Sequence, residues 1–80
     1  MSFSYKELSK FIRSYAHIKQ ITFKSCQVTG DLSDIKFNPK HRFYLQSLAF
    51  IKCKIEDWDE FVENLKQQNK EFNEIRIYKL

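Results

Sequence analysis

The sequence predicts an α/β fold in which parallel strands lie side by side and helices cover one face of their sheet. A five-position apolar pattern, neither the alternation of a plain strand nor the period of a helix, begins at Ile18 and again 27 residues later at Leu45. A helical stripe with apolar residues at i, i+3, i+4 and i+7 begins at Leu8 and again 50 residues later at Trp58. The chain between the first two expected strands is too long for a hairpin turn, which favours a crossover connection.

The repeated pattern has the form L-x-x-L-x-L-x-x-(N/C)-x-L, which is a short strand followed by a bend that turns the chain away. Its positions are held by Ile18, Ile21, Phe23, Cys26 and Val28, then by Leu45, Leu48, Phe50, Cys53 and Ile55, and in part by Phe72, Ile75, Ile77 and Leu80. On these residues the chain resembles the leucine-rich repeat family, in particular its cysteine-containing and ribonuclease-inhibitor-like branches. The resemblance implies a small curved solenoid, with three parallel strands on the concave side and helices on the convex side.

The resemblance implies a single leucine-rich-repeat domain over residues 1–80. Residues 1–17 would be an N-terminal capping helix, residues 18–44 the first repeat, residues 45–71 the second and residues 72–80 a partial third. The first repeat departs from the family because it lacks a clear helix, and the third consists of a strand alone. Family members mostly bind other proteins through the concave sheet, and catalysis is not typical of them.

The first helix is expected at residues 5–15. Ser4, with Glu7 three residues later, forms a capping-box pattern that marks a helix start. One face of the helix is apolar and the other polar, which suits the end of a solenoid. The apolar face carries Leu8, Phe11, Ile12 and Tyr15, and the polar face carries Lys6, Lys10, Arg13 and Ser14.

Strands are expected at residues 19–23, 46–50 and 73–78. After the first strand, Leu32 and Ile35 allow only a short helical turn before Asn38-Pro39 stops it. The second helix starts at residues 57–60, whose acidic side chains suit the positive end of the helix dipole. The alternative fold is an α+β sandwich with an antiparallel sheet, such as a ferredoxin-like variant, which the long connection between the first two strands disfavours.

Composition limits the class of protein. The chain has 80 residues, 42% of them hydrophobic, and a net charge of +4, which is a weak indication of nucleic acid or anionic lipid as a partner. No stretch is apolar enough to span a membrane. Two cysteines without secretory features predict an intracellular, reducing compartment, the cytoplasm first. The basic, Ser-containing start faintly resembles a mitochondrial transit peptide, so a mitochondrial location is the alternative.

No catalytic, cofactor-binding or metal-binding site is expected, so we predict that the protein is not an enzyme. His17 and His41 share no metal-ligand spacing with either cysteine. A disulfide or two-thiol metal site could be drawn between Cys26 and Cys53, but small buried residues are the better interpretation. The alternative function is a small basic α+β module that binds RNA, although most aromatic residues already belong to core positions.

The predicted binding surface is the concave face, where residues between the core positions point outward. Stacking at the 27-residue spacing gives the columns Thr22-Ala49-Arg76, Lys24-Ile51-Tyr78 and Ser25-Lys52-Lys79. Ala49, Ile51 and Tyr78 would form an apolar centre within a basic rim, as in binding hot spots.

The C-terminal strand is expected to be an open edge, and the last residue Leu80 belongs to the predicted site. A protein partner that covers this edge, the concave sheet or both is therefore expected, with a homodimer as the alternative. Nucleic acid is the less favoured partner.

Overall fold

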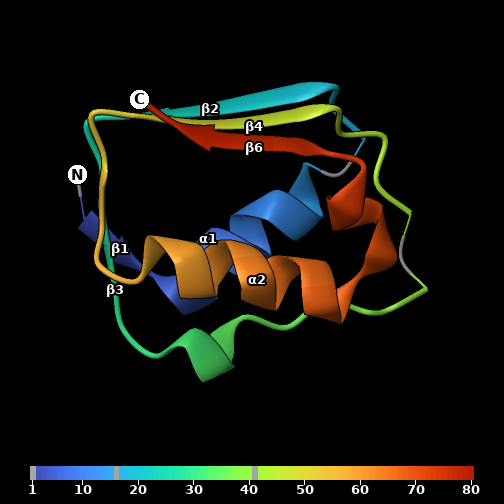
Figure 1. The fold of residues 1–80 in the computed structure, drawn as a ribbon, viewed down its shortest axis with the longest axis horizontal. Coiled ribbons are helices and arrows are strands. Elements are labelled where there is room, and N and C mark those ends of the chain that lie inside the picture. Colours follow the sequence, from blue (N-terminus) through green and yellow to red (C-terminus); the bar gives the residue numbers. More distant parts are fainter. Residues whose placement is uncertain (1, 16, 41) are drawn as a thin grey trace.

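The structure, a computed structural model, describes residues 2–15, 17–40 and 42–80 (Figure 1). The six strands are β1 (Ser2–Ser4), β2 (Gln20–Lys24), β3 (Gln27–Thr29), β4 (Ser47–Ile51), β5 (Lys54–Ile55) and β6 (Arg76–Lys79). The helices are α1 (Tyr5–Ser14) and α2 (Trp58–Gln68), and the 3-10 turns are η1 (Leu32–Asp34) and η2 (Lys70–Asn73).

The strands form two sheets of three, with the orders β1-β3-β5 and β2-β4-β6. Within each sheet, the neighbouring strands pair in parallel. The predicted α/β class with parallel strands is therefore confirmed, whereas the prediction of a single three-stranded sheet is incomplete. In Figure 1 the sheet β2-β4-β6 lies along the top and the two helices lie beneath it. The sheet β1-β3-β5 stands at one end of the molecule, at an angle to the first.

A single residue turns the chain from one sheet into the other. Ser25, between β2 and β3, has φ 53°, and Lys52, between β4 and β5, has φ 54°. Both are left-handed conformations that residues with a Cβ rarely adopt. The two bends lie side by side, because the N–H of Lys54 donates to the C=O of Cys26 at 2.8 Å. The expected bend is thus confirmed after β2 and after β4.

The strand register corrects the predicted columns. Gln20 pairs with Ser47 and Gln27 with Lys54, which is the expected spacing of 27, but Ser47 pairs with Arg76, a spacing of 29. The return through α2 and η2 is longer by two residues, so Ile77, and not Ile75, lies beside Leu48. Ala49 consequently faces Tyr78 rather than Arg76, and Ile51 lies in the column of Leu80 rather than Tyr78.

The predicted first helix is confirmed to within one residue. Ser4 accepts a hydrogen bond from the N–H of Glu7, and the Glu7 carboxylate accepts one from the N–H of Ser4, which completes the capping box. Leu8 and Ile12 are buried as expected. The segment predicted as a capping helix alone also contains β1, which pairs with β3.

Phe11, Tyr15 and Ile18 were expected to face the core, but they are 43%, 41% and 37% exposed. Ile18 lies outside because β2 begins only at Gln20. Phe11 and Tyr15 lie on the side of α1 that the sheet does not cover, and the consequence for the site is described below.

A row of aromatic rings crosses the layer between the sheet β2-β4-β6 and the helices. Centroid distances are 4.7 Å from Tyr15 to Phe11, 5.4 Å from Phe11 to Phe23 and 5.1 Å from Phe23 to Phe50. The row continues to Trp58 at 5.4 Å and to Phe61 at 5.8 Å, both on α2. Ring pairs at such distances add to the stabilisation that burial already provides.

The connection between β3 and β4 is irregular, as expected, apart from the short turn η1. Polar side chains at the end of α2 make hydrogen bonds to the backbone of this connection, in place of the bonds that a helix would provide. The Oε1 of Gln68 accepts from the N–H of Phe37 at 2.8 Å, and the Nε2 of Gln68 donates to the C=O of Ile35. The Nδ2 of Asn69 donates to the C=O of Asn38 at 2.9 Å. We call this connection, residues 30–46, the irregular arm.

Among the described residues, no helix combines the length and apolar character needed to cross a membrane.

Candidate interaction surfaces

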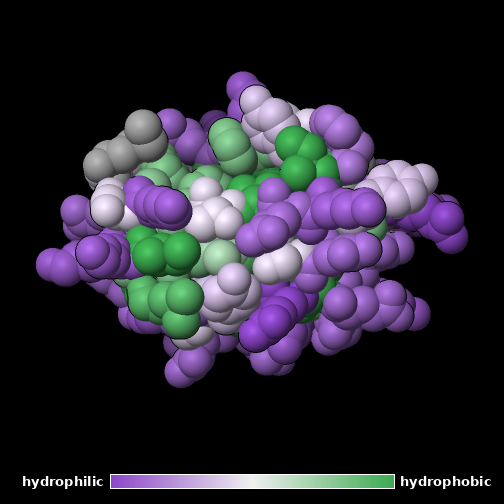
Figure 2. All heavy atoms as spheres, turned by 90° about the horizontal axis from the view of Figure 1, so that it is seen from above, coloured by the Kyte–Doolittle hydropathy of each residue, from purple (hydrophilic) through white to green (hydrophobic). Residues whose placement is uncertain are grey.

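The outer face of the sheet β2-β4-β6 is the surface that was predicted to bind a partner. Figure 2 shows this face from above as largely hydrophilic, with apolar groups set among polar ones. Ile21 and Phe23 of β2 are buried against the helices, so the alternate residues point outward. With the observed register, the outward columns are Gln20-Ser47-Arg76, Thr22-Ala49-Tyr78 and Lys24-Ile51, which Leu80 extends just after β6.

Most predicted residues do lie on or beside this face. Thr22, Lys24, Lys52 and Arg76 are exposed, and Ile51 and Tyr78 are half-buried. Leu80 was also placed at a core position of the repeat, but it is 73% exposed. Ala49 is a correction, because it is only 1% exposed and so cannot contact a partner. Its methyl group is short and lies in the central strand between its neighbours on β2 and β6.

Two cations of β6 lie on opposite faces of the sheet. The guanidinium carbon of Arg76 lies 5.2 Å from the ring centroid of Tyr78, on the outer face. The Nζ of Lys79 lies 5.6 Å from the ring centroid of Trp58, on the helix side. The prediction that Lys79 belongs to the rim of the outer face is therefore wrong, because its register position beside Phe50 points inward.

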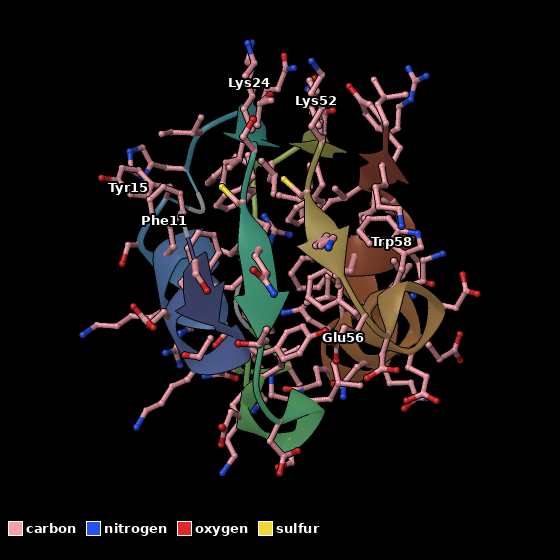
Figure 3. The ribbon with its side chains drawn as sticks, turned by 90° about the vertical axis from the view of Figure 1, so that its left-hand side faces the viewer. Phe11, Tyr15, Lys24, Lys52, Glu56 and Trp58 are labelled. Carbon is pink, nitrogen blue, oxygen red and sulfur yellow. The ribbon has the colours of Figure 1, made fainter. Side chains whose placement is uncertain are left out.

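A groove that the sequence interpretation did not predict lies on the flank of the molecule formed by α1, β1 and β2. It has a volume of about 670 Å³, and Phe3, Phe11, Tyr15 and Phe23 supply its aromatic surface. Lys10, Lys24 and Glu7 also line it. We call it the flank groove. Figure 3 places Phe11 and Tyr15 on this flank and Trp58 on the opposite one.

The backbone hydrogen bonds determine which groups of β2 face the flank groove. The C=O of Lys19 accepts from the N–H of Ser47 at 3.2 Å, and the N–H of Ser25 donates to the C=O of Ile51 at 2.9 Å. The odd-numbered residues of β2 therefore bond to β4. Since bonding alternates along a parallel strand, the N–H and C=O groups of Gln20, Thr22 and Lys24 point toward the open side. Within residues 2–15, 17–40 and 42–80, no strand pairs with them.

The outer backbone edge of β6 is also unpaired among the described residues, but an inward-pointing charge protects it. The N–H groups of Arg76 and Leu80 donate to the C=O groups of Gln46 and Phe50, at 3.0 and 2.8 Å, so the backbone of Ile77 and Lys79 faces away. An inward-pointing lysine on an edge strand discourages pairing with another strand. The inward residues of β2 are Ile21 and Phe23, neither of them charged. The edge of β2 thus lacks the protection that Lys79 gives to the edge of β6, whereas the sequence predicted the unprotected edge at the C-terminal strand.

Both cysteines are free thiols at equivalent places after the two bends. The Sγ of Cys26 contacts the C=O of Lys24 at 3.2 Å, and the Sγ of Cys53 contacts the C=O of Phe23 at 3.4 Å. Burial raises the pKa of the Cys26 thiol, and the neighbouring Cys53 raises it further. A thiol with a raised pKa is a poor nucleophile at neutral pH, which favours the interpretation of Cys26 as a core residue.

No metal centre can be assigned. In the part of the chain that the structure describes, His, Cys, Asp and Glu nowhere gather in threes in a metal-binding arrangement. His17 is exposed, and His41 lies outside the described residues.

The sequence shows the apolar residues of the flank groove but not their exposure. α1 carries an apolar stripe of four positions, of which Leu8 and Ile12 are buried. The aromatic members Phe11 and Tyr15 are the ones left over.

Comparison with known proteins gives no relative. No protein-family model matches the sequence, and neither a curated protein nor a solved structure shows a significant match to the chain.

Proposed function

We propose that this chain is a non-catalytic module that binds another protein, as a small subunit of a larger assembly. The single observation that carries the proposal is the flank groove, where Phe11 and Tyr15 stand exposed beside the unpaired edge of β2. Large exposed apolar surfaces with a polar rim are typical of interaction sites. Tyrosine is also enriched among the residues that dominate binding energy.

The outer face of the sheet β2-β4-β6 is the second part of the proposed interface. Arg76 stacked on Tyr78, beside the half-buried Ile51 and the exposed Leu80, provides an aromatic and cationic group of the kind found in hot spots. Thr22 and Lys24 line the flank groove and also lie in the outward columns of this sheet, so one partner could contact both surfaces.

RNA binding is the alternative function. The net charge of +4 and a shallow hollow lined by Lys52 and Lys54 favour it. Against it, core rings such as Phe23 and Phe50 cannot stack on bases. The exposed Phe11 and Tyr15 lie beside the open backbone edge of β2, which suits a peptide strand. A titration against generic RNA at rising salt separates the two functions, because phosphate-driven binding falls steeply with salt concentration.

We further propose that the fold is a short leucine-rich-repeat solenoid with its helices on the convex side. The shared 27-residue register of both sheets and the equivalent left-handed bends at Ser25 and Lys52 support it. The test is glycine at each bend. Ser25→Gly and Lys52→Gly should each raise the free energy of unfolding by about 0.5–1 kcal/mol, because glycine adopts a positive φ without steric cost. A gain at one bend and a loss at the other would contradict their equivalence.

The protein-binding proposal is tested by site-directed photo-crosslinking in native lysate. A photoreactive benzoyl-phenylalanine replaces Tyr15 in the flank groove, Tyr78 on the outer face, or Tyr44, which is exposed in the irregular arm. A discrete adduct from Tyr15, identified by mass spectrometry and absent at Tyr44, is the expected result. Excess unlabelled protein should compete for the adduct, and Phe11→Ala should weaken it. If the Tyr15 and Tyr78 probes both give no more crosslinked adduct than the Tyr44 probe, the proposal that these surfaces bind a protein is wrong.

A further inference from the structure

The two sheets are stepped relative to each other at the flank groove. Each of β2 and β4 passes through a bend into a strand of the other sheet, β2 into β3 and β4 into β5. The sheet β1-β3-β5 extends one strand farther on this flank, because β1 lies beyond β3. Among the described residues, no strand lies beside β2 at the position that β1 holds beside β3. The flank groove lies at this step.

The side walls of the step suit an extended chain. Thr22 and Lys24, whose backbone groups point away from β4, line the groove on one side. Phe11 of α1 and Phe3 of β1 line it on the others, and their rings lie 5.4 and 5.9 Å from that of Phe23. A strand placed beside β2 would therefore find backbone donors and acceptors along its edge and aromatic surface beneath its inward side chains.

We propose that the flank groove binds an extended, acidic segment of another protein as an additional strand beside β2. This inference rests on the proposed protein-binding function and specifies its partner. In the bound segment, two apolar side chains, two residues apart, face Ile21 and Phe23 and pack on Phe11. The residue of the segment that lies beside Lys24 points outward, as Lys24 does, and carries a carboxylate.

Charge favours an acidic partner over a second copy of this chain. Among the described residues, Lys10 and Lys24 line the groove against Glu7, and the whole chain carries +4. Two copies would bring like charges together, and the β6 edge of a second copy would present Arg76 and Lys79. Such charges contribute more to the rate of encounter and to partner choice than to affinity, so discrimination between acidic and basic segments is the expected signature.

The test uses a fluorescently labelled peptide with alternating valine and phenylalanine at the inward positions and glutamate at the flanking ones. Binding to the full chain, followed by fluorescence anisotropy, is expected at micromolar concentrations, typical of strand addition by short segments. The same peptide with lysine in place of glutamate should bind at least about tenfold more weakly. Methylating alternate backbone nitrogens of the peptide, on the edge that faces β2, should abolish binding without altering the protein.

Thr22→Pro is the matching change in the protein. Proline removes an N–H that faces the open side and leaves the ladder to β4 intact, as edge strands tolerate. Thr22→Pro should bind the peptide at least about tenfold more weakly than Thr22→Val, which loses the same hydroxyl but keeps the N–H. Circular dichroism and thermal melting test whether both variants fold. If Thr22→Pro does not fold, the methylated peptide alone decides whether the segment binds as a strand.

Several results would overturn the inference. One is that the acidic peptide fails to bind at about 1 mM, and another is that the methylated or basic peptide binds as well as the acidic one. Self-association of the chain that Thr22→Pro abolishes would assign the groove to a second copy instead. A crosslinked adduct at Tyr15 that persists in Thr22→Pro would leave protein binding intact and refute strand addition. Absence of that adduct in the wild type would refute the proposed function itself.

Discussion

At the scale of single residues, Tyr5 shows a conflict between packing and polarity. Its ring is buried and lies 5.6 Å from that of Phe61, and its hydroxyl lies near the backbone of Asp57 but makes no hydrogen bond of normal geometry among the described residues. A buried polar group without a partner costs about 1–3 kcal/mol. Tyr5→Phe keeps the ring and removes the hydroxyl, so we expect the free energy of unfolding in urea to rise by about 1 kcal/mol.

The control for Tyr5→Phe is Tyr5→Leu, which also removes the hydroxyl but leaves a cavity beside Phe61. Tyr5→Leu should therefore be less stable than Tyr5→Phe by about 1–3 kcal/mol. A loss of stability in Tyr5→Phe would mean that the hydroxyl makes a hydrogen bond in solution.

We expect two buried groups to make the stability decrease at alkaline pH. Burial raises the pKa of Cys26 above its ordinary value of 9.0, and burial, followed by the nearby Asp57 carboxylate, raises that of Tyr5 above 10.0. Each group ionises more readily in the unfolded chain. Its contribution is therefore complete below the unfolded pKa and is lost as pH rises toward the folded one. We expect the urea midpoint to be constant between about pH 7 and 8.5 and to fall above about pH 9.

The double variant Tyr5→Phe, Cys26→Ala tests this assignment, because it contains neither titrating group. Its urea midpoint should fall less steeply above about pH 9 than that of the wild type. An equally steep fall would assign the alkaline instability to other groups.

At the scale of the elements, α2 has a second role besides covering the sheet. Gln68 accepts from the N–H of Phe37 and donates to the C=O of Ile35, and so replaces the bonds that a helix would have formed within the irregular arm. Gln68→Leu would leave both backbone groups without a partner. We expect a loss of about 2–6 kcal/mol in the free energy of unfolding, at about 1–3 kcal/mol for each of the two groups.

The matched control is Gln67→Leu, a change of the exposed neighbour that should cost less than about 0.5 kcal/mol. Hydrogen exchange at the amide of Phe37, measured by NMR, should accelerate in Gln68→Leu and not in Gln67→Leu. Equal stability of the two variants would show that the irregular arm does not depend on Gln68.

The elements differ in how far the sequence reveals them. The start of α1 was predictable because the Ser4–Glu7 capping box is a local interaction, and β2 and β4 because the same apolar pattern recurs 27 residues apart. The strands β1 and β5 have three and two residues and no readable alternation, so they form only where a neighbouring strand is already in place. The spacing of 29 at β6 depends on η2, whose length the apolar pattern does not show.

At the scale of the whole molecule, the two ends of the strand stack are unequal. The aromatic row ends at Phe11 and Tyr15 on the β2 flank, which are open, and at Trp58 on the other, which Lys79 covers. The alternation of strand residues predicted Thr22, Lys24, Arg76 and Tyr78 on the outer face, since it is a local property. It could not identify the flank groove, because which part of the α1 stripe stays exposed depends on where α1 packs against β1 and β3.

Because the edges of β2 and β6 differ in charge, a substitution of one residue, Lys79, is expected to change the oligomeric state. Lys79 occupies the inward position beside Phe50 on β6, and a charge there opposes pairing of β6 with another strand. With Lys79→Ile, β6 presents two inward isoleucines, the native Ile77 and the introduced side chain, that complement the apolar inward residues of β2 in a second copy. Such head-to-tail contacts do not close on themselves, so open chains of copies should form.

Sedimentation velocity at rising micromolar concentration is the measurement. The wild type should sediment as a monomer, and Lys79→Ile should associate with an affinity at least about tenfold higher than any wild-type self-association. Lys66→Ile, which adds the same side chain at an exposed position of α2, should behave as the wild type does. Adding Thr22→Pro to Lys79→Ile should restore the monomer, because it blocks the edge of β2 that the new contact uses. Association of Lys79→Ile that survives Thr22→Pro would mean that the copies meet through another surface.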